Sequence, residues 1–368
     1  MTINTDKEKS KKNKERKISV GKSSLILILT LVFMTTTLVI GIFAFRFYIT
    51  ASRDDVVDKE YNKYYVMITD DIKSSFWQSV YQGAYLNGLD SDVFVELLGD
   101  SLSEEYSCEE LMRIAIASHV DGIIVYADES KEMTTLIDEA VADGIPVVTL
   151  YSDNTRSNRC SYVGVSGYNI GREYGYQAID IIKEKRRDKI LESDYDIESI
   201  DITILIDAEE KSSTQNVIIS SMQDTIREEA PANSEYEINI VPVDRTNAFS
   251  VEESIRDIFM EEKIPDVLVC LNELDTTCVY QAVVDYNMVG NVSILGYYDS
   301  DTILNAIDRN VIYATVSVDT NQMGKFCVDA INEFIELGNT SQYFTADVTL
   351  INKANVDYYM KKEDANNE

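Results

Sequence analysis

Residues 120–150, VDGIIVYADESKEMTTLIDEAVADGIPVVTL, carry the pattern from which the fold class follows. Its two ends, residues 121–127 and 145–150, are short apolar runs rich in β-branched side chains, and residues 130–143 repeat apolar side chains with the period of a helix. A strand, a helix and a second strand in this order predict a βαβ unit on a parallel sheet. The expected fold class is therefore α/β.

The same alternation continues on both sides of this stretch. Further strands are expected at residues 64–69, 92–98, 201–206, 237–243, 265–271, 292–298 and 313–318. Helices are expected near residues 75–88, 107–118, 168–187, 213–229, 249–262, 273–287, 299–309 and 320–337.

The alternation breaks at two places, which predicts two lobes. The polar segment 151–167 leads to a short strand rather than a helix, and a second break follows Val318. If the chain crosses between lobes at both places, lobe 1 comprises residues 63–166 and 319–347, and lobe 2 comprises residues 167–318 and 348–360. We therefore expect two Rossmann-like parallel sheets joined by a hinge of several strands, which suits closure of one lobe onto the other.

The first 62 residues predict a membrane anchor. Residues 1–22 carry eight lysines and arginines against three acids, a net charge of +5, and form an expected cytoplasmic tail. Residues 23–49 contain the apolar run LILILTLVFMTTTLVIGIFAFRFY, which is long enough to cross a bilayer as one helix. A cleaved signal peptide is the alternative, but the run exceeds the usual apolar core and no clear cleavage site follows it. Residues 50–62 then form a stalk, and the domain at 63–368 is expected outside the cell membrane.

Composition excludes several classes of function. The total charge of −31 leaves −36 for the residues after the basic tail, so binding of nucleic acid is not expected. The five scattered cysteines form no paired motif, and His119 is the sole histidine, so neither a disulfide framework nor a metal site is expected. No nucleophile, base and orienting group stand in a recognisable spacing, and no cofactor motif occurs. We therefore expect a binding protein without cofactor or metal, not an enzyme.

Ligands of open parallel sheets bind beyond the carboxyl ends of the strands. That rule selects the residues that follow the expected strands: Asp70, Asp71, Tyr151, Ser152, Asp207, Glu209, Asp244, Arg245, Asn272, Tyr298 and Asp299.

Several segments together resemble a known family. They are SSFWQSVYQGA (74–84), SYVGVSGYNIGREYG (161–175), LNELDTTCVYQAVVDYN (271–287), ILGYYDSDTILNAIDRNVIYATVSVDTNQMG (294–324), and the opening stretch itself. In this order they resemble the periplasmic-binding-protein type I fold of the ribose and galactose solute-binding proteins, over about 300 residues. No helix-turn-helix precedes the domain, which distinguishes it from the related repressors.

The resemblance implies a ligand site between the lobes. Phe76 and Trp77 match an aromatic pair that stacks on the apolar face of a sugar ring, although both could instead pack in the core. Asn272 matches an asparagine that bonds ligand hydroxyls, although it could equally cap the helix that follows. Asp71, which follows the first expected strand and could instead cap its loop, and Ser74 are also expected to contact the ligand.

The sequence also departs from the family pattern. Tyr151 and Tyr298 stand where the family places ligand-binding aspartates, Val318 replaces a polar residue, and Asn216 stands where sugar binders carry an arginine. Arg245 occupies a position that is often aromatic; it could stack on the ligand, bind an anion or face solvent. The cleft is therefore expected to be more aromatic and less acidic than a ribose site.

These features predict a membrane-anchored solute-binding protein that closes on a small polar ligand, most simply a sugar, and delivers it to an ABC importer. The alternative is a ligand sensor of the same fold that signals to a partner membrane protein such as a histidine kinase. The sequence does not separate the two.

Overall fold

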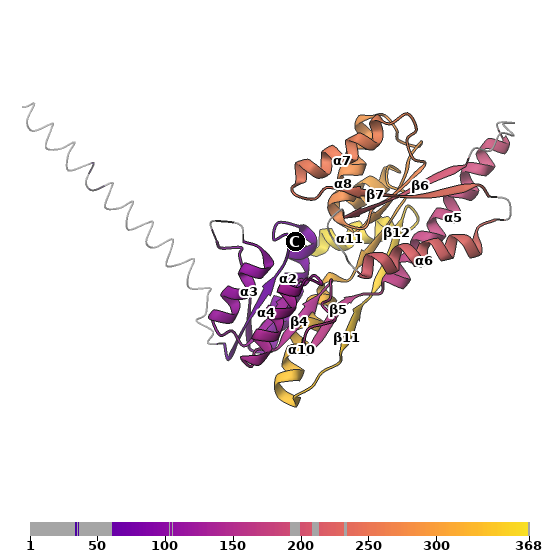
Figure 1. Ribbon diagram of the computed structural model, residues 1–368. Coiled ribbons are helices and arrows are strands. Elements are labelled where there is room, and N and C mark those ends of the chain that lie inside the picture. Colours follow the sequence, from indigo (N-terminus) through magenta and orange to yellow (C-terminus); the bar gives the residue numbers. More distant parts are fainter. Residues whose placement is uncertain are drawn as a thin grey trace, which may run out of the picture. The chain divides into compact units, whose positions relative to one another are not determined.

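The computed structural model describes residues 61–366, except residues 103, 105, 192–198, 208–212 and 232–233, and two positions before them, Met34 and Thr36 (Figure 1). The chain divides into two units, Met1–Glu60 and Tyr61–Glu368. Within the described part, no helix combines the length and apolarity that crossing a bilayer needs. The anchor predicted at residues 23–49 lies outside that part apart from its two described positions, so it stays a prediction.

The unit from Tyr61 onward contains two six-stranded sheets, as the alternation of strands and helices predicts. The lobe 1 sheet has the order β11-β5-β4-β3-β1-β2. Its strands are β1 (Lys63–Ile68), β2 (Val93–Leu97), β3 (Gly122–Val125), β4 (Val147–Leu150), β5 (Ser161–Val165) and β11 (Tyr343–Ala346). Its helices are α2 (Ser75–Asp90), α3 (Cys108–Ala117), α4 (Lys131–Ala142) and α10 (Thr320–Leu337).

The lobe 2 sheet has the order β12-β10-β9-β8-β6-β7. Its strands are β6 (Ile200–Asp207), β7 (Tyr236–Val243), β8 (Val267–Val269), β9 (Ser293–Tyr297), β10 (Ala314–Val318) and β12 (Val348–Asn352). Its helices are α5 (Gly167–Leu191), α6 (Ser213–Glu229), α7 (Ala248–Met260), α8 (Glu273–Asp285), α9 (Asp301–Asp308) and α11 (Val356–Asn366).

The two C-terminal strands join different sheets. β11 pairs parallel with β5, whereas β12, only two residues further on, pairs antiparallel with β10. The chain therefore passes between the sheets near Ser166, Asp319 and Asp347, and Figure 1 shows β11 and β12 in different sheets. Two of these crossings are hydrogen-bonded to each other: the backbone amide of Asp319 donates to the carbonyl of Asp347 at 2.9 Å.

Strand burial explains why the sheets form. Every residue of β3, β4 and β8 is buried, which is the pattern of central parallel strands that are covered by helices on both faces. The register between β6 and β7 runs from Ile200 opposite Tyr236 to Asp207 opposite Val243, so both strands end level with each other. The loops that follow them consequently emerge at the same edge of the sheet.

Candidate functional site

A cavity of about 650 Å³ lies where the strand ends of both lobes meet. Its lining residues follow β1, β3 and β4 in lobe 1 and β6, β7, β8 and β9 in lobe 2, as the rule for open α/β sheets leads one to expect. The lining residues are Asp70, Asp71, Lys73, Ser74, Phe76, Trp77, Tyr126, Tyr151, Asp207, Thr214, Gln215, Ile218, Arg245, Thr246, Asn247, Ala248, Leu271, Asn272, Glu273, Leu274 and Tyr297.

The lobe 1 wall of the cavity is aromatic. Phe76 and Trp77, in the first turn of α2, meet edge to face with their ring centroids 5.0 Å apart. Trp77 also lies 5.7 Å from Tyr126 and 5.8 Å from Tyr151, again nearly perpendicular to each. Phe76 and Trp77 are only 6% and 5% exposed. Core packing and ligand contact are therefore compatible for this pair, since the rings pack in the core and also line the cavity.

Two tyrosines at the strand ends have left-handed backbones. Tyr151, after β4, has φ 65°, and Tyr298, after β9, has φ 75°. Each amide still donates to the neighbouring strand, that of Tyr151 to Val163 and that of Tyr298 to Val316, both at 2.8 Å. A bulky residue rarely adopts this conformation, and strain of that kind concentrates at ligand clamps and other functional sites. The two positions correspond in the two lobes, and both turn the chain toward the region where the lobes meet.

The lobe 2 wall is polar and is organised around one buried carboxylate. The Asp275 side chain is fully buried and is bonded by the guanidinium of Arg245, which also lies 3.6 Å from Asp207. The side-chain amide of Asn272 donates to the same carboxylate at 3.0 Å. Burial raises the pKa of Asp275, while Arg245 and Asn272 act in the opposite direction. Arg245 is thus held in the wall of the cavity, 21% exposed, rather than extended into solvent.

Asn272 has a structural role as well as a place in the cavity. Its side-chain oxygen accepts a bond from the Asp275 amide at 2.8 Å, which caps the N-terminus of α8. The helix-capping alternative is therefore what the structure shows, and the side chain nevertheless lines the cavity.

Most of the residues selected from the sequence meet at this cavity. Its lining includes Asp71, Ser74, Phe76, Trp77, Tyr151, Arg245 and Asn272. Asn216 is not part of the lining: it is exposed on α6, and its neighbours Thr214 and Gln215 line the cavity in its place. Tyr298 lies behind the wall, 8% exposed, with its ring 5.4 Å from that of Phe76.

Several residues that line the cavity were not among the ligand contacts predicted from the sequence. Tyr126 and Tyr297 lie one residue inside the ends of the expected strands 121–127 and 292–298, so the strand-end rule would have selected them only if those ends had been placed two residues earlier. Glu273 stands in the first turn of a helix, where an acidic residue ordinarily stabilises its own helix and so gives no separate signal.

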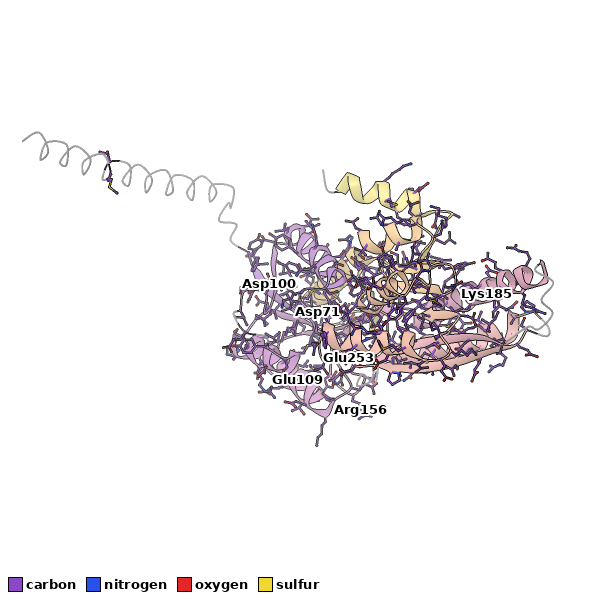
Figure 2. The ribbon with its side chains drawn as sticks, turned by 90° about the horizontal axis from the view of Figure 1, so that it is seen from above. Asp71, Asp100, Glu109, Arg156, Lys185 and Glu253 are labelled. Atoms are coloured by element: carbon purple, nitrogen blue, oxygen red, sulfur yellow. The ribbon has the colours of Figure 1, made fainter. Side chains whose placement is uncertain are left out.

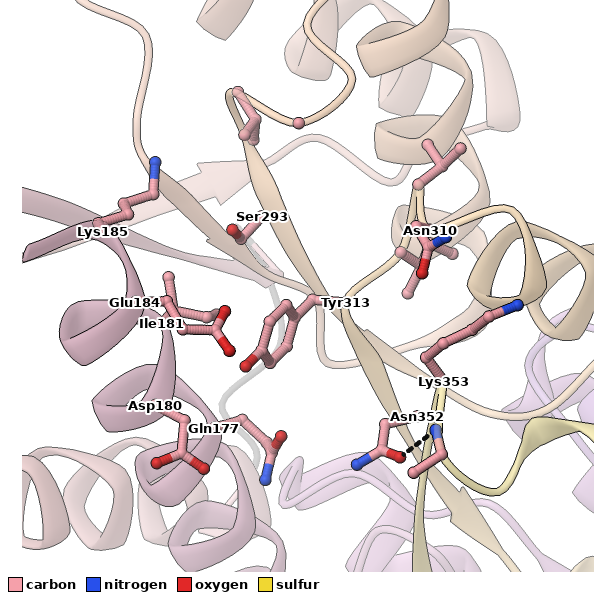
Figure 3. Close-up of a pocket in the computed structure, with 15 residues that line it drawn as sticks. Gln177, Asp180, Ile181, Glu184, Lys185, Ser293, Asn310, Tyr313, Asn352 and Lys353 are labelled. Carbon is pink, nitrogen blue, oxygen red and sulfur yellow. Dashed lines mark hydrogen bonds between the residues drawn. The ribbon is translucent and has the colours of Figure 1, made fainter. Parts of the chain in front are cut away.

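A second cavity, of about 520 Å³, lies in lobe 2 (Figure 3). It includes residues at the starts of β9 and β10, such as Ser293 and Tyr313, at the edge of the sheet opposite to the one where such folds bind ligands. Its two lysines are engaged in salt bridges, Lys185 with Asp266 at 3.0 Å and Lys353 with Asp308 at 2.6 Å. The cavity between the lobes is therefore the better candidate for the ligand site.

Comparison with known proteins agrees with this geometry. The profile of a family described as the periplasmic binding protein domain matches residues 65–340. The chain belongs to the periplasmic-binding-protein domain family. The type I fold inferred from the sequence is thereby confirmed, and the family consists of solute-binding proteins, which are not enzymes.

Solved structures give the same result. A structure of XylFII is 26% identical, with a TM-score of 0.63, and the match covers 79% of this chain and 98% of that chain. A complex of XylFII with LytSN matches with the same identity and coverage and a TM-score of 0.64. GanP, a glucose-galactose binding protein from Geobacillus stearothermophilus, is 20% identical with a TM-score of 0.65, over 79% of this chain and 98% of that chain, which shows the fold alone. Among curated protein sequences no match is found.

Proposed function

We propose that this periplasmic-binding-protein domain binds a sugar in the cavity between its lobes. The observation that carries the proposal is the pairing of an aromatic wall on lobe 1 with a polar wall on lobe 2. A sugar ring has one face of C–H groups that is stabilised against an aromatic ring, while its hydroxyls need directed hydrogen bonds. Arg245, Asn272 and Gln215 supply such groups opposite Trp77.

Closure of the lobes is the means of binding in this proposal. The chain passes between the sheets at three adjacent places, so the lobes can move as rigid bodies about a short hinge. A ligand that contacts both walls favours the closed form by its extra contacts there. In the proposed setting, the helix at residues 23–49 holds the domain outside the cell, and the closed form delivers the sugar to an ABC importer.

The test is calorimetry on the purified full chain in detergent micelles. Xylose, arabinose, glucose, galactose and allose form one panel, and amino acids and nucleosides form the control panel. We expect at least one neutral sugar to bind with a dissociation constant in the micromolar range and the controls not to bind. A folded protein that binds none of the sugars would contradict the proposal.

One observation favours a second function for the same site. The XylFII structures have the highest identity of the matches described above, and one of them is a complex with a second protein, LytSN. In the second proposal the closed domain switches a partner membrane protein, such as a histidine kinase, instead of supplying an importer. Deletion of the gene distinguishes the two: the importer role predicts loss of labelled-sugar uptake, and the sensor role predicts loss of sugar-dependent gene expression with uptake retained by a constitutively expressed transporter.

A further inference from the structure

Helix α2, which carries Phe76 and Trp77, begins without the stabilising features that most other helices of the chain have. Its N-cap residue Ser74 makes no side-chain capping bond, and its first turn has no acidic residue. By contrast, the N-cap side chains of α3, α4, α7, α8 and α10 each accept a bond from their own helix. The first amides of α2 therefore need acceptors from elsewhere, because a helix leaves its first four N–H groups without partners inside the helix.

A carboxylate from the other lobe supplies the acceptor. Glu273, the first residue of α8 in lobe 2, accepts a bond from the Phe76 amide through Oε2 at 3.3 Å. The same oxygen accepts from the Ser74 hydroxyl at 3.3 Å, and Oε1 accepts from the Ser75 hydroxyl. Glu273 thus does for α2 what a capping residue normally does for its own helix, and its negative charge lies at the positive end of the helix dipole.

A second contact joins the lobes at the same place. The Tyr298 hydroxyl, from lobe 2, donates to the Ser75 carbonyl at 3.4 Å, and its ring packs edge to face on Phe76. Tyr298 is held there by its left-handed backbone after β9. Both cross-lobe contacts therefore meet the first turn of α2, the turn that builds the aromatic wall.

We propose that Glu273 is a closure latch, a residue of lobe 2 that caps the lobe 1 helix α2 and thereby stabilises the closed domain before any ligand enters. Opening the lobes breaks all three bonds to Glu273 and exposes the uncapped start of α2, so the latch acts on the closed form only. The latch positions Phe76 and Trp77 for the ligand. Its effect on affinity rests on the sugar-binding function proposed above, whereas its effect on closure does not.

Closure can be followed by the fluorescence of Trp77. Trp77 is the chain's one tryptophan, so tryptophan fluorescence, excited at wavelengths that tyrosine does not absorb, reports on this site alone. The ring is 5% exposed in the latched form and lines the cavity that opening would expose. Quenching by acrylamide on the full chain in detergent therefore measures how often the cavity opens.

The first experiment compares ligand-free variants. We expect Glu273→Ala to raise the acrylamide quenching constant of Trp77 about threefold or more, and Glu273→Gln, which keeps an acceptor without the charge, to fall between it and the unmodified chain. Glu253→Ala is the matched control, because Glu253 is an exposed glutamate of α7 outside the cavity lining (labelled in Figure 2). Equal quenching in Glu273→Ala and the unmodified chain, with both folded by circular dichroism, would overturn the latch.

A second measurement distinguishes opening of the lobes from a local exposure of Trp77 beside position 273. Hydrogen exchange followed by mass spectrometry should show faster exchange in Glu273→Ala both at the start of α2 and in the strand ends around Tyr126 and Tyr151. Faster exchange confined to residues beside position 273 would also overturn the proposal. Ser75→Ala combined with Glu273→Ala should add little to Glu273→Ala, because both changes break the same contact.

The third experiment uses whichever sugar binds in the calorimetric panel. Glu273→Ala should weaken its binding roughly tenfold, the scale expected for losing one charged helix cap, without changing the order of preference among sugars. A changed order would mean that Glu273 contacts the ligand and is not a latch. If no sugar binds, the sugar proposal fails, while the quenching and exchange results still decide the latch.

Discussion

The buried carboxylate of Asp275 determines the electrostatics of the lobe 2 wall. It is fully buried, Arg245 is the cation bonded to it, and its Oδ1 atom has no hydrogen-bond partner among the residues that the structure describes. A charge in such a place is costly unless it is paired, so burial raises the pKa of Asp275 despite the nearby guanidinium. The ion pair between Arg245 and Asp275 therefore holds Arg245 at the cavity, and the stability that each side chain contributes depends on the presence of the other.

Replacing Arg245 by methionine tests this dependence. Arg245→Met leaves a buried, unpaired carboxylate, so we expect the free energy of unfolding at pH 7.5 to fall by about 3–5 kcal/mol. Asp275 already binds a proton more readily in the folded chain than in the unfolded chain, and loss of the cation raises its pKa further. A raised pKa of this kind favours folding at low pH, and that contribution is lost as pH rises through the folded-state value.

The destabilisation by Arg245→Met should therefore be smaller at pH 5 than at pH 7.5, as measured by urea unfolding at both values. Adding Asp275→Asn to Arg245→Met removes the unpaired charge and should restore part of the lost stability at pH 7.5. A loss that is the same at both pH values would show that the cost comes from packing and not from the carboxylate.

At the scale of elements, the close packing of α2 on α10 fixes the helix that carries the aromatic wall. Gly83 and Gly324 lie at the contact, and a Cβ added to Gly324 would be 2.1 Å from the Val80 carbonyl oxygen and 2.3 Å from the Ala84 amide nitrogen. Both atoms belong to the backbone of α2, so they cannot move aside as a flexible side chain would. The glycines are needed for this close approach.

Gly324→Ala should consequently destabilise the protein, although alanine is the better helix former by about 1 kcal/mol. We expect a net loss of about 1–3 kcal/mol in unfolding free energy, the usual cost of overpacking, together with weaker sugar binding as α2 shifts. Lys325→Ala, in an exposed position of the same helix turn, is the control and should change stability by less than about 0.5 kcal/mol. A more stable Gly324→Ala would contradict the packing argument.

The elements themselves could be predicted from the sequence where burial sets the pattern. The apolar runs of β1, β3, β4 and β8 indicated buried strands, and the helical periods between them indicated helices. β11 and β12 were not predicted, since both are short strands that are mostly exposed or half-buried and carry little apolar pattern. α11 was also missed, because its composition is largely polar.

The site was less predictable than the fold, for a physical reason. Strand-end geometry brings together residues distant in the sequence, so Tyr151, Arg245 and Asn272 could be selected by rule. The left-handed backbones of Tyr151 and Tyr298 have no such signal, because sequence statistics favour glycine or asparagine there. The bonds from Glu273 to α2 depend on how one lobe meets the other, which local sequence does not encode.

At the scale of the whole molecule, the basic N-terminus predicts the side of a membrane on which the domain lies. Residues 1–22 carry a net charge of +5 and the remaining residues −36, with the apolar run at 23–49 between them. Positive charge tends to stay on the cytoplasmic side of a spanning helix, so in the proposal the domain lies outside. The anchor and this orientation are both part of the proposal.

Cell fractionation gives the decisive measurement for the anchor. The full chain should sediment with the membranes and resist extraction by alkaline carbonate, because about 20 apolar residues suffice for a stable span. The chain beginning at residue 55 should be soluble and should bind the same sugar with unchanged affinity, since the cavity lies entirely in later residues. Protease added to intact cells or protoplasts should digest the domain of the full chain; digestion only after lysis would reverse the orientation, and a full chain released by carbonate would remove the anchor from the proposal.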